Sequence, residues 1–250
     1  MSRKIGSITP IWNQELFLKP HFEMLSKLDK NVVLLHERPL PDYHKEHGYS
    51  TKPDLSEKIL RKYFPNVEIY KSEYPEGKEF GADIYNEGLK YVQDCDIVFR
   101  LDPDMFFEDQ VWDDLLSYIQ NTNYDYYQMD FAQDSINYYE TGKYSFGVKD
   151  AKEMDPLAFS PKYELTNPHG TFEWAWGNET IIKFPGFFCH HFRGWNKPKS
   201  TSAGWHNGDY ARTMLELYGN DGEWYNVPKS IQEKEEKWLK ELEEIKNETR

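Results

Sequence analysis

An α/β fold with a mostly parallel central sheet and helices on both faces is predicted by two features of the chain. Short apolar runs typical of buried strands alternate with helical patterns over the first half of the sequence. Strands and helices that alternate in this way form a parallel sheet covered on both sides. The length of 250 residues suits one such domain, which we place at residues 1–228, followed by a charged helix at 229–250.

The expected elements follow one another in chain order. Strands are expected at 4–8, 31–35, 67–70, 97–101 and 126–131, and helices at 14–28, 54–64, 81–92 and 109–120. The helical segments repeat apolar residues at helical spacing, and the strand at 31–35 contains Val-Val-Leu-Leu, a run typical of a strand buried on both faces. Later in the chain, strands are expected at 180–184 and 187–191, hinged at Pro185-Gly186, and a helix at 209–218.

The helix at 229–250 carries a thin apolar stripe on an otherwise charged segment. The stripe consists of Ile231, Trp238, Leu242 and Ile245. It either docks on the domain or pairs with a second copy of the chain, as helices do in coiled coils. Both alternatives stay open, and a homodimer through this helix is one expectation.

Composition excludes several classes of protein. The net charge of −13 argues against binding a nucleic-acid polymer and against binding anionic lipid. No apolar run reaches the length of a membrane span, and the first residues lack the apolar core of a signal peptide. We therefore expect a cytoplasmic protein. Cys95 and Cys189 lie in apolar runs and are predicted to be buried free thiols.

The apolar run at 97–101 ends in two carboxylates, Asp102 and Asp104, separated by Pro103. Proline ends the hydrogen-bond ladder of a strand, and ligands of open α/β sheets bind at the carboxyl ends of the strands. Two acids at that position can hold a divalent cation, which in turn can hold phosphates. The alternative is that Asp102 caps the helix that follows.

Aromatic residues make up 16% of the chain, with 18 Tyr and 8 Trp. Their flat apolar faces with polar tips suit sugars and nucleobases, although an aromatic core would use the same residues.

Four segments, in this order, carry a family resemblance: Thr9-Pro10-Ile11-Trp12-Asn13, Gly81 to Leu89, Ile97 to Asp104, and Thr180 to Arg193. They resemble the opening nucleotide-binding loop, the Ala-Arg-Asn-x-Gly helix, the strand leading to Asp-x-Asp, and the late strand with a metal-binding histidine of GT-A glycosyltransferases. The similarity is to glycosyltransferase family 2 and covers roughly residues 4 to 195.

The resemblance implies a GT-A (nucleotide-diphospho-sugar transferase) fold and a metal-dependent glycosyltransferase of the hexosyltransferase type. Such an enzyme moves a sugar from a nucleotide-diphosphate donor to a hydroxyl of a carbohydrate or glycan acceptor, and inversion of the sugar carbon is favoured over retention. The expected metal is Mn²⁺ or Mg²⁺, because both accept hard oxygen ligands and a histidine tilts the choice towards Mn²⁺.

The resemblance also implies the metal ligands. Asp104 is the expected direct ligand, and Asp102 contacts the ribose or reaches the metal through water. Neighbouring strand residues face opposite ways, so only one of His190 and His191 can point at the site, and we favour His191. The alternative is one buried and one surface histidine.

The residues expected to bind the donor are Thr9, Pro10, Trp12, Asn13, Asn86, Asp102 and Arg193. Arg193, with Lys197 and Lys199, would hold the diphosphate, since guanidinium groups pair well with phosphate oxygens. A solvated basic loop is the alternative.

The expected catalytic base is Glu179. The segment Trp174-Ala-Trp-Gly-Asn-Glu179 distantly resembles a Trp-Gly-x-Glu-Asp loop of metal-dependent GT-A enzymes, in which an acid is the base. Glu173 and Asp134 are further candidates. Trp174 and Trp176 either stack on sugars or pack in the core.

Two departures and two rival functions accompany this hypothesis. His36 and Glu37 stand where the family has a base-reading acid, and Asp83-Ile84-Tyr85 stands where an arginine is common. A nucleotidyltransferase would need a glycine-rich basic loop after the first strand, which the chain lacks. A non-catalytic carbohydrate-binding or assembly protein would show no metal dependence.

Overall fold

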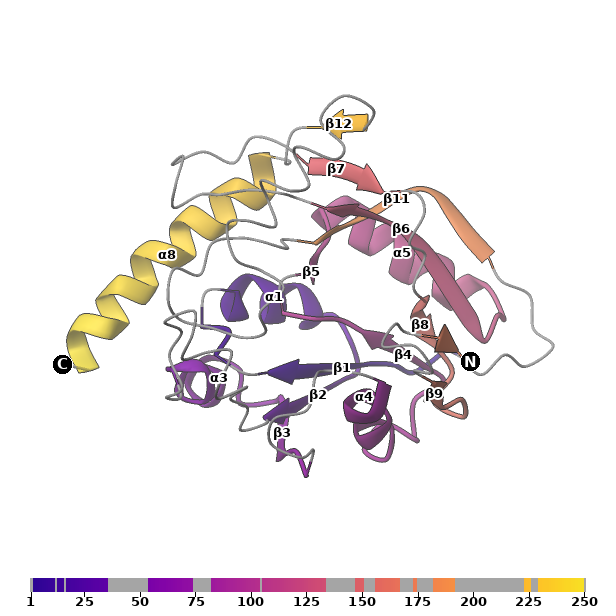
Figure 1. Ribbon diagram of the computed structural model, residues 1–250, viewed down its shortest axis with the longest axis horizontal. Helices are drawn as coiled ribbons and strands as arrows, with labels where there is room; N and C mark the ends of the chain where they lie inside the picture. The colour runs from indigo at the N-terminus through magenta and orange to yellow at the C-terminus, as the bar shows by residue number, and fades with distance from the viewer. Residues whose placement is uncertain are drawn as a thin grey trace.

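A ten-stranded sheet organises the chain, with the strand order β12-β7-β6-β8-β4-β1-β2-β3 along its main path (Figure 1). The computed structural model describes residues 2–11, 13–15, 17–35, 54–73, 82–103, 105–133, 147–150, 156–166, 173–174, 182–191, 223–225 and 229–249. The expectations for Trp12, His36, Glu37, Asp104, Asp134, Trp176, Glu179, Arg193, Lys197, Lys199 and a helix at 209–218 lie outside these residues.

The first half of the chain confirms the predicted parallel α/β order. Strands β1 (Ile5–Ile11), β2 (Lys30–Leu35), β3 (Glu68–Lys71) and β4 (Ile97–Arg100) pair in parallel in the order β3-β2-β1-β4. Residues such as Val32, Val33 and Leu34 are fully buried, because both faces of this part of the sheet are covered.

Beyond β4 the sheet becomes mixed. Strand β8 (Pro156–Phe159) runs antiparallel between β4 and β6 (Tyr126–Gln133), and β7 (Gly147–Asp150) and β12 (Glu223–Tyr225) follow in antiparallel pairs. A separate two-stranded sheet joins β9 (Leu165–Thr166) and β10 (Glu173–Trp174). Strand β6 was predicted, but the other strands are short and carry little periodicity, so the sequence indicated only loops and short strands over 134–178 without their bounds.

Strand β11 (Ile182–His191) replaces the two hinged strands expected at 180–184 and 187–191. It is one continuous strand, parallel to β6, and Pro185-Gly186 coincides with a shift in register between Lys183 and Phe188. A proline and a glycine in a strand mark an irregularity of this kind rather than an end. At its far end β11 pairs with β5 (Met105–Phe106).

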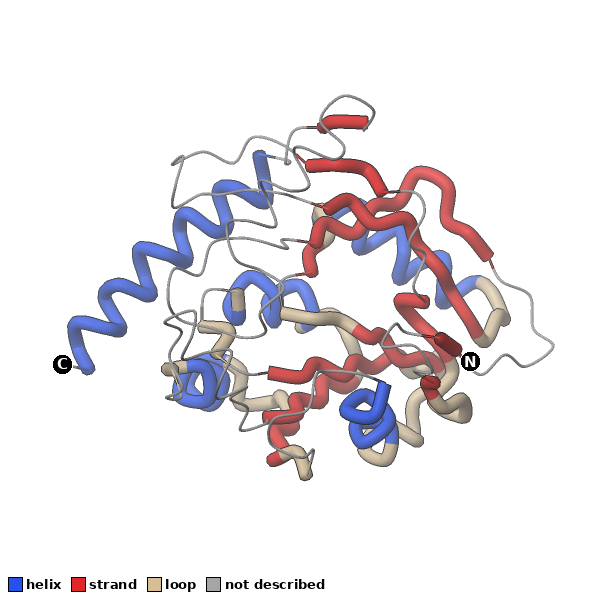
Figure 2. The backbone as a smooth tube through the Cα atoms, in the orientation of Figure 1, coloured by secondary structure: helices blue, strands red, loops and turns tan. Residues whose placement is uncertain are grey.

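Helices cover both faces of the sheet, as predicted (Figure 2). On one face α1 (Leu18–Leu25), α3 (Ser56–Tyr63), α5 (Asp109–Asn121) and α8 (Lys229–Thr249) contribute to one apolar cluster with Phe22, Ile59, Trp112 and Trp238. On the other face α4 (Ala82–Leu89) contributes Ile84, Tyr85 and Leu89 to a second cluster. Strand β1 contributes side chains to both clusters, with Ile5 and Ile11 in the first and Ile8 in the second.

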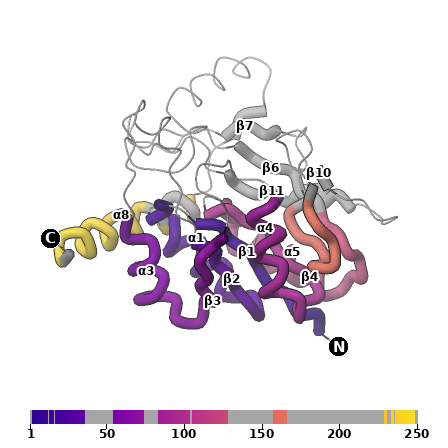
Figure 3. Tube along the Cα trace, turned by 60° about the horizontal axis from the view of Figure 1, so that its bottom comes forward, coloured from indigo at the N-terminus to yellow at the C-terminus, as the bar shows by residue number. Residues whose placement is uncertain are grey.

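The charged C-terminal helix docks on the domain. Trp238, Leu242 and Ile245 of the predicted apolar stripe are 1%, 2% and 5% exposed, and they belong to the core cluster of α1, α3 and α5. Figure 3 shows α8 lying beside α1 and α3. These three side chains are therefore buried within one chain.

Two expectations from composition can be compared with the described residues. Cys95 is buried and unbonded to another cysteine, and burial raises the pKa of its thiol to about 11. No helix in the described part of the chain is long and apolar enough to cross a membrane.

Helix α4 approaches β1 so closely that only glycine fits at the contact. A Cβ atom on Gly88 would lie 2.5 Å from Cγ2 of Ile8, which is completely buried. This contact gives a physical reason for the glycine of the Asn86-Glu87-Gly88 segment.

We expect Gly88→Ala to lower the free energy of unfolding by about 1–3 kcal/mol, because the added methyl group overpacks the contact with Ile8. Urea denaturation measures the change. Asp83→Ala, on the exposed side of the same helix, is the control and should stay within about 0.5 kcal/mol of the parent. Equal or greater stability of Gly88→Ala would contradict the close packing, since alanine is otherwise the better helix former.

Candidate active site

The carboxyl ends of β1 and β4 meet at the point where the strand order reverses. From β1 the chain moves outward to β2 and β3, then returns to the opposite edge of β1 as β4. Ile8 is the register partner of Arg100, and the amide of Leu101 donates to the carbonyl oxygen of Ile8 at 3.3 Å. Such switch points are where open α/β sheets bind their ligands, so the residues that follow β1 and β4 define the candidate site.

Asp102 lies at this position, just beyond the end of β4. The amide of Met105 donates to the carbonyl oxygen of Asp102 at 3.0 Å, the hydrogen bond of a β-turn, and Pro103 takes the second position that proline favours. The amide of Asp102 lies 3.4 Å from the sulfur of Met105. We call this link the 102–105 turn. Asp104 belongs to it by sequence and lies outside the described residues.

Asp102 does not cap the helix that follows, which excludes the alternative reading of this residue. Helix α5 begins at Asp109, and its N-cap position is Glu108. The half-buried Asp102 carboxylate instead accepts a hydrogen bond from the hydroxyl of Tyr85 in α4. Its position is therefore set by α4 and not by α5.

Tyr85 is a site residue that the sequence did not single out as such. It is 1% exposed, and burial, followed by the negative charge of Asp102, raises the pKa of its hydroxyl well above 10. The hydroxyl therefore stays protonated and donates to Asp102 at any working pH. The guanidinium carbon of buried Arg100 lies 5.1 Å from the centre of the Tyr85 ring. The helical spacing of Tyr85 with Leu89 indicated its burial, but not its partner.

The loop after β1 is fastened to the start of α3. Asn13 has a left-handed backbone (φ 49°), a conformation that asparagine tolerates, and its side-chain oxygen accepts from the amide of Asp54 at 2.9 Å. The amide of Gln14 donates to the hydroxyl of Ser56 at 2.9 Å, and that of Glu15 to the Asp54 carboxylate at 3.1 Å. Burial, together with the nearby charge of Glu15, raises the pKa of Asp54.

Helix α8 holds the same loop from the other side. The indole N–H of Trp238 donates to the carbonyl oxygen of Glu15 at 3.0 Å, and Lys246 forms an ion pair with the Glu15 carboxylate. Lys19, in α1, pairs with Glu241 of α8. The C-terminal helix thus orders a loop at the candidate site although it is distant in sequence.

Besides Asn13, which bonds the amide of Asp54, three of the expected donor-binding residues have structural roles. The hydroxyl of Thr9 is completely buried beside His21, and Pro10 is a buried β1 residue opposite Leu34. The side-chain amide of Asn86 bonds the backbone of Leu165 twice, accepting from its amide at 2.8 Å and donating to its carbonyl oxygen at 2.7 Å. Asn86 therefore fastens β9 to α4, and contact of these three residues with a donor stays a prediction.

Backbone register places the end of β11 beside β5, which begins three residues after Asp102. His191 is the register partner of Met105, the residue that follows Asp104, and His190 is the partner of Phe106. Carboxylate oxygens and an imidazole nitrogen form a donor set suited to Mn²⁺ or Mg²⁺, so Asp102 and the histidines of β11 are residue types that fit the implied metal. Among the side chains that the structure describes, no three acids, histidines or cysteines gather closely enough to hold a metal.

No protein-family model matches the sequence, and the search of curated proteins found no match. A crystal structure of S. aureus TarS residues 1–349 in complex with UDP-GlcNAc is similar over 88% of this chain and 68% of that chain, with 14% identity and a TM-score of 0.49. TarS 1–349 is also matched over 52% of this chain and 36% of that chain, with 19% identity and a TM-score of 0.38.

Glucosyl-3-phosphoglycerate synthase from Mycobacterium tuberculosis, in complex with Mn²⁺, UDP and glucosyl-3-phosphoglycerate, is similar over 52% of this chain and 44% of that chain, with 14% identity and a TM-score of 0.37. The chain aligns to only 36% and 22% of two of the TarS structures.

We expect Tyr85→Phe to lower the free energy of unfolding by about 1.5–3 kcal/mol, because the half-buried Asp102 carboxylate loses a hydrogen-bond donor. Urea denaturation measures this loss. Tyr70→Phe is the matched control, since it removes a hydroxyl bonded to Glu68 at the sheet edge and should cost no more than about 0.5 kcal/mol. Equal costs for the two variants would contradict the role given to Tyr85.

Proposed function

We propose that the chain is a metal-dependent glycosyltransferase of the GT-A class that moves a sugar from a nucleotide-diphosphate donor to a hydroxyl of a carbohydrate acceptor. The observation that carries the proposal is the position of Asp102. It lies at the switch point of the sheet, on a turn that continues into a second carboxylate and pairs with a strand ending in two histidines.

Asp104 and His191 would ligate Mn²⁺ or Mg²⁺ directly, and Asp102 would bind the metal through water or hold the ribose. When bound, the metal neutralises the charge that builds on the departing diphosphate. The Tyr85 hydroxyl orients one oxygen of the Asp102 carboxylate, and the other oxygen would contact the metal-bound water or the ribose. Arg193 would add a guanidinium contact to the diphosphate.

The reaction needs a base on the acceptor side. As the acceptor oxygen forms a bond to the sugar carbon, the bond from that carbon to the diphosphate oxygen breaks and the hydroxyl proton passes to a carboxylate. We propose Glu179 for this carboxylate, with inversion at the sugar carbon and a hexose as the transferred group. The loop after β1, held by Asp54 and α8, would carry the nucleotide through Trp12 and Asn13.

Three further expectations stay predictions. They are the cytoplasmic location, the homodimer, and the division into a domain at 1–228 and a helix at 229–250. The burial of Trp238 supports a helix that completes the domain rather than one that stands apart from it.

A thermal-shift screen with UDP, GDP, ADP and CDP, each with and without Mn²⁺, tests the proposal. We expect one nucleotide to raise the melting temperature in a Mn²⁺-dependent way, since a ligand at 100 times its Kd stabilises the native state by about 2.7 kcal/mol. The shift should disappear in Asp104→Ala. Asp94→Asn, at an exposed aspartate of the Asp94-Cys95-Asp96 triplet before β4, is the control and should keep the shift. A screen in which no nucleotide gives a Mn²⁺-dependent shift would refute the proposal and favour a non-catalytic binding protein.

A further inference from the structure

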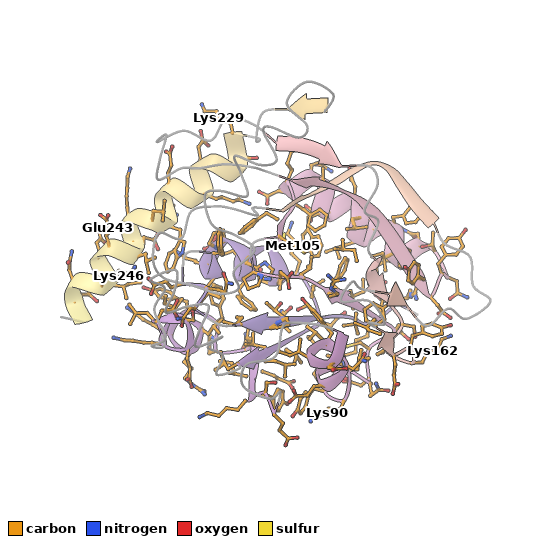
Figure 4. All side chains as sticks on the ribbon, in the orientation of Figure 1. Lys90, Met105, Lys162, Lys229, Glu243 and Lys246 are labelled. Atoms are coloured by element: carbon orange, nitrogen blue, oxygen red, sulfur yellow. The ribbon has the colours of Figure 1, made fainter. Side chains whose placement is uncertain are left out.

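His21 joins the end of β1 to the residue that follows Asp104. It lies in α1 and is completely buried. Its Nδ1 atom is 3.1 Å from the carbonyl oxygen of Met105, and its Nε2 atom is 3.4 Å from the hydroxyl oxygen of Thr9. Figure 4 marks Met105 in the interior, beside α1.

The partners of His21 define its hydrogen-bonding state. A carbonyl oxygen only accepts, so Nδ1 carries the proton and donates to Met105. In the neutral ring Nε2 is then an acceptor, and the Thr9 hydroxyl is its donor. A buried imidazole with these two hydrogen bonds links the Met105 backbone to the Thr9 side chain and does not act as a solvent-exposed base.

The ring of His21 is also held in place by its neighbours. It meets the rings of Phe22 and Phe106 edge-on, with centroid distances of 5.2 and 6.1 Å. Trp112 donates to the carbonyl oxygen of Met24 at 3.0 Å, which fastens α1 to α5. The imidazole therefore has little freedom to follow a shift of Met105.

The backbone amide and carbonyl groups of Met105 form hydrogen bonds at the candidate site. Its amide donates to Asp102, its carbonyl oxygen accepts from His21, and its backbone is in register with His191. The 102–105 turn is thus anchored at one end by Tyr85, through Asp102, and at the other end by His21, through Met105. Asp104 lies between these anchors in the sequence.

We propose that His21 is a positioning residue for the metal site, an inference that rests on the proposed function. Its N–H holds the Met105 carbonyl oxygen in place. The carboxylates of the 102–105 turn then keep the distance from the histidines of β11 that a divalent metal requires. Partners of this indirect kind set metal affinity because coordination tolerates little displacement of the ligands.

The test compares two substitutions that lose similar packing but differ in one donor. His21→Asn keeps an N–H donor close to the position of Nδ1, whereas His21→Leu has none. Phe22→Leu is the control, because it removes buried volume beside the ring and leaves the bond to Met105 intact. Mn²⁺ is titrated into each protein in an equimolar mixture of UDP, GDP, ADP and CDP, and bound Mn²⁺ is followed by water-proton relaxation. Melting temperatures are recorded without metal.

We expect the Kd for Mn²⁺ to rise about 10- to 100-fold in His21→Leu and to change much less in His21→Asn and Phe22→Leu, although all three melt below the parent protein. Equal Mn²⁺ affinity in His21→Leu and the parent would overturn the role of His21 and leave the proposed function standing. Equal losses in His21→Leu and His21→Asn would also overturn it, because the donor would then not matter. Absence of Mn²⁺ binding by the parent would refute both the positioning role and the proposed metal site.

Discussion

The parallel pairing of β1 on both of its edges is the constraint on which the rest of the structure depends. With β2 on one edge and β4 on the other, the carboxyl ends of β1 and β4 are held side by side by backbone hydrogen bonds. The strand is buried on both faces, so a shift of its register would disturb the hydrophobic clusters on both sides of the sheet. The candidate site therefore lies on a strand pair that two hydrophobic cores hold in place.

Side-chain hydrogen bonds from the surrounding helices fix the two segments that follow β1 and β4. The loop after β1 is tied to Asp54 and to α8, and the turn after β4 is tied to Tyr85 and His21. These anchors come from the residues at the start of α3 and from α8, α4 and α1, so helices on both faces of the sheet contribute. Sites held in this way bind ligands with little loss of conformational freedom, which is the general advantage of preorganisation.

The sequence predicts the strands and helices that show a regular apolar spacing, and it does not locate the short strands that lack one. The alternation of strands and helices through residue 131 was predictable because the apolar spacing changes from one element to the next. Strands β5, β7, β8, β9, β10 and β12 are too short to show a period, and the antiparallel insertion of β8 is a tertiary choice that no local pattern encodes.

The same division applies to the site. Asp102 could be predicted as a candidate because an apolar strand followed by Asp-Pro-Asp is a local signal, and the residue lies just beyond the end of β4. The sequence did not single out the partners Tyr85 and His21, because their hydrogen bonds reach segments 17 and 84 residues away. The two hydrogen bonds between Asn86 and the backbone of Leu165 could not be predicted either, because the two residues are 79 positions apart in the sequence.

An anomalous difference map at the manganese edge, from crystals grown with Mn²⁺ and the four nucleoside diphosphates, tests the central claim most directly. The account predicts one strong peak in direct coordination with Asp104, close to Asp102 and to a histidine of β11, with diphosphate density beside it. A peak elsewhere on the chain, or nucleotide density at the carboxyl ends of β1 and β4 without manganese, would contradict it.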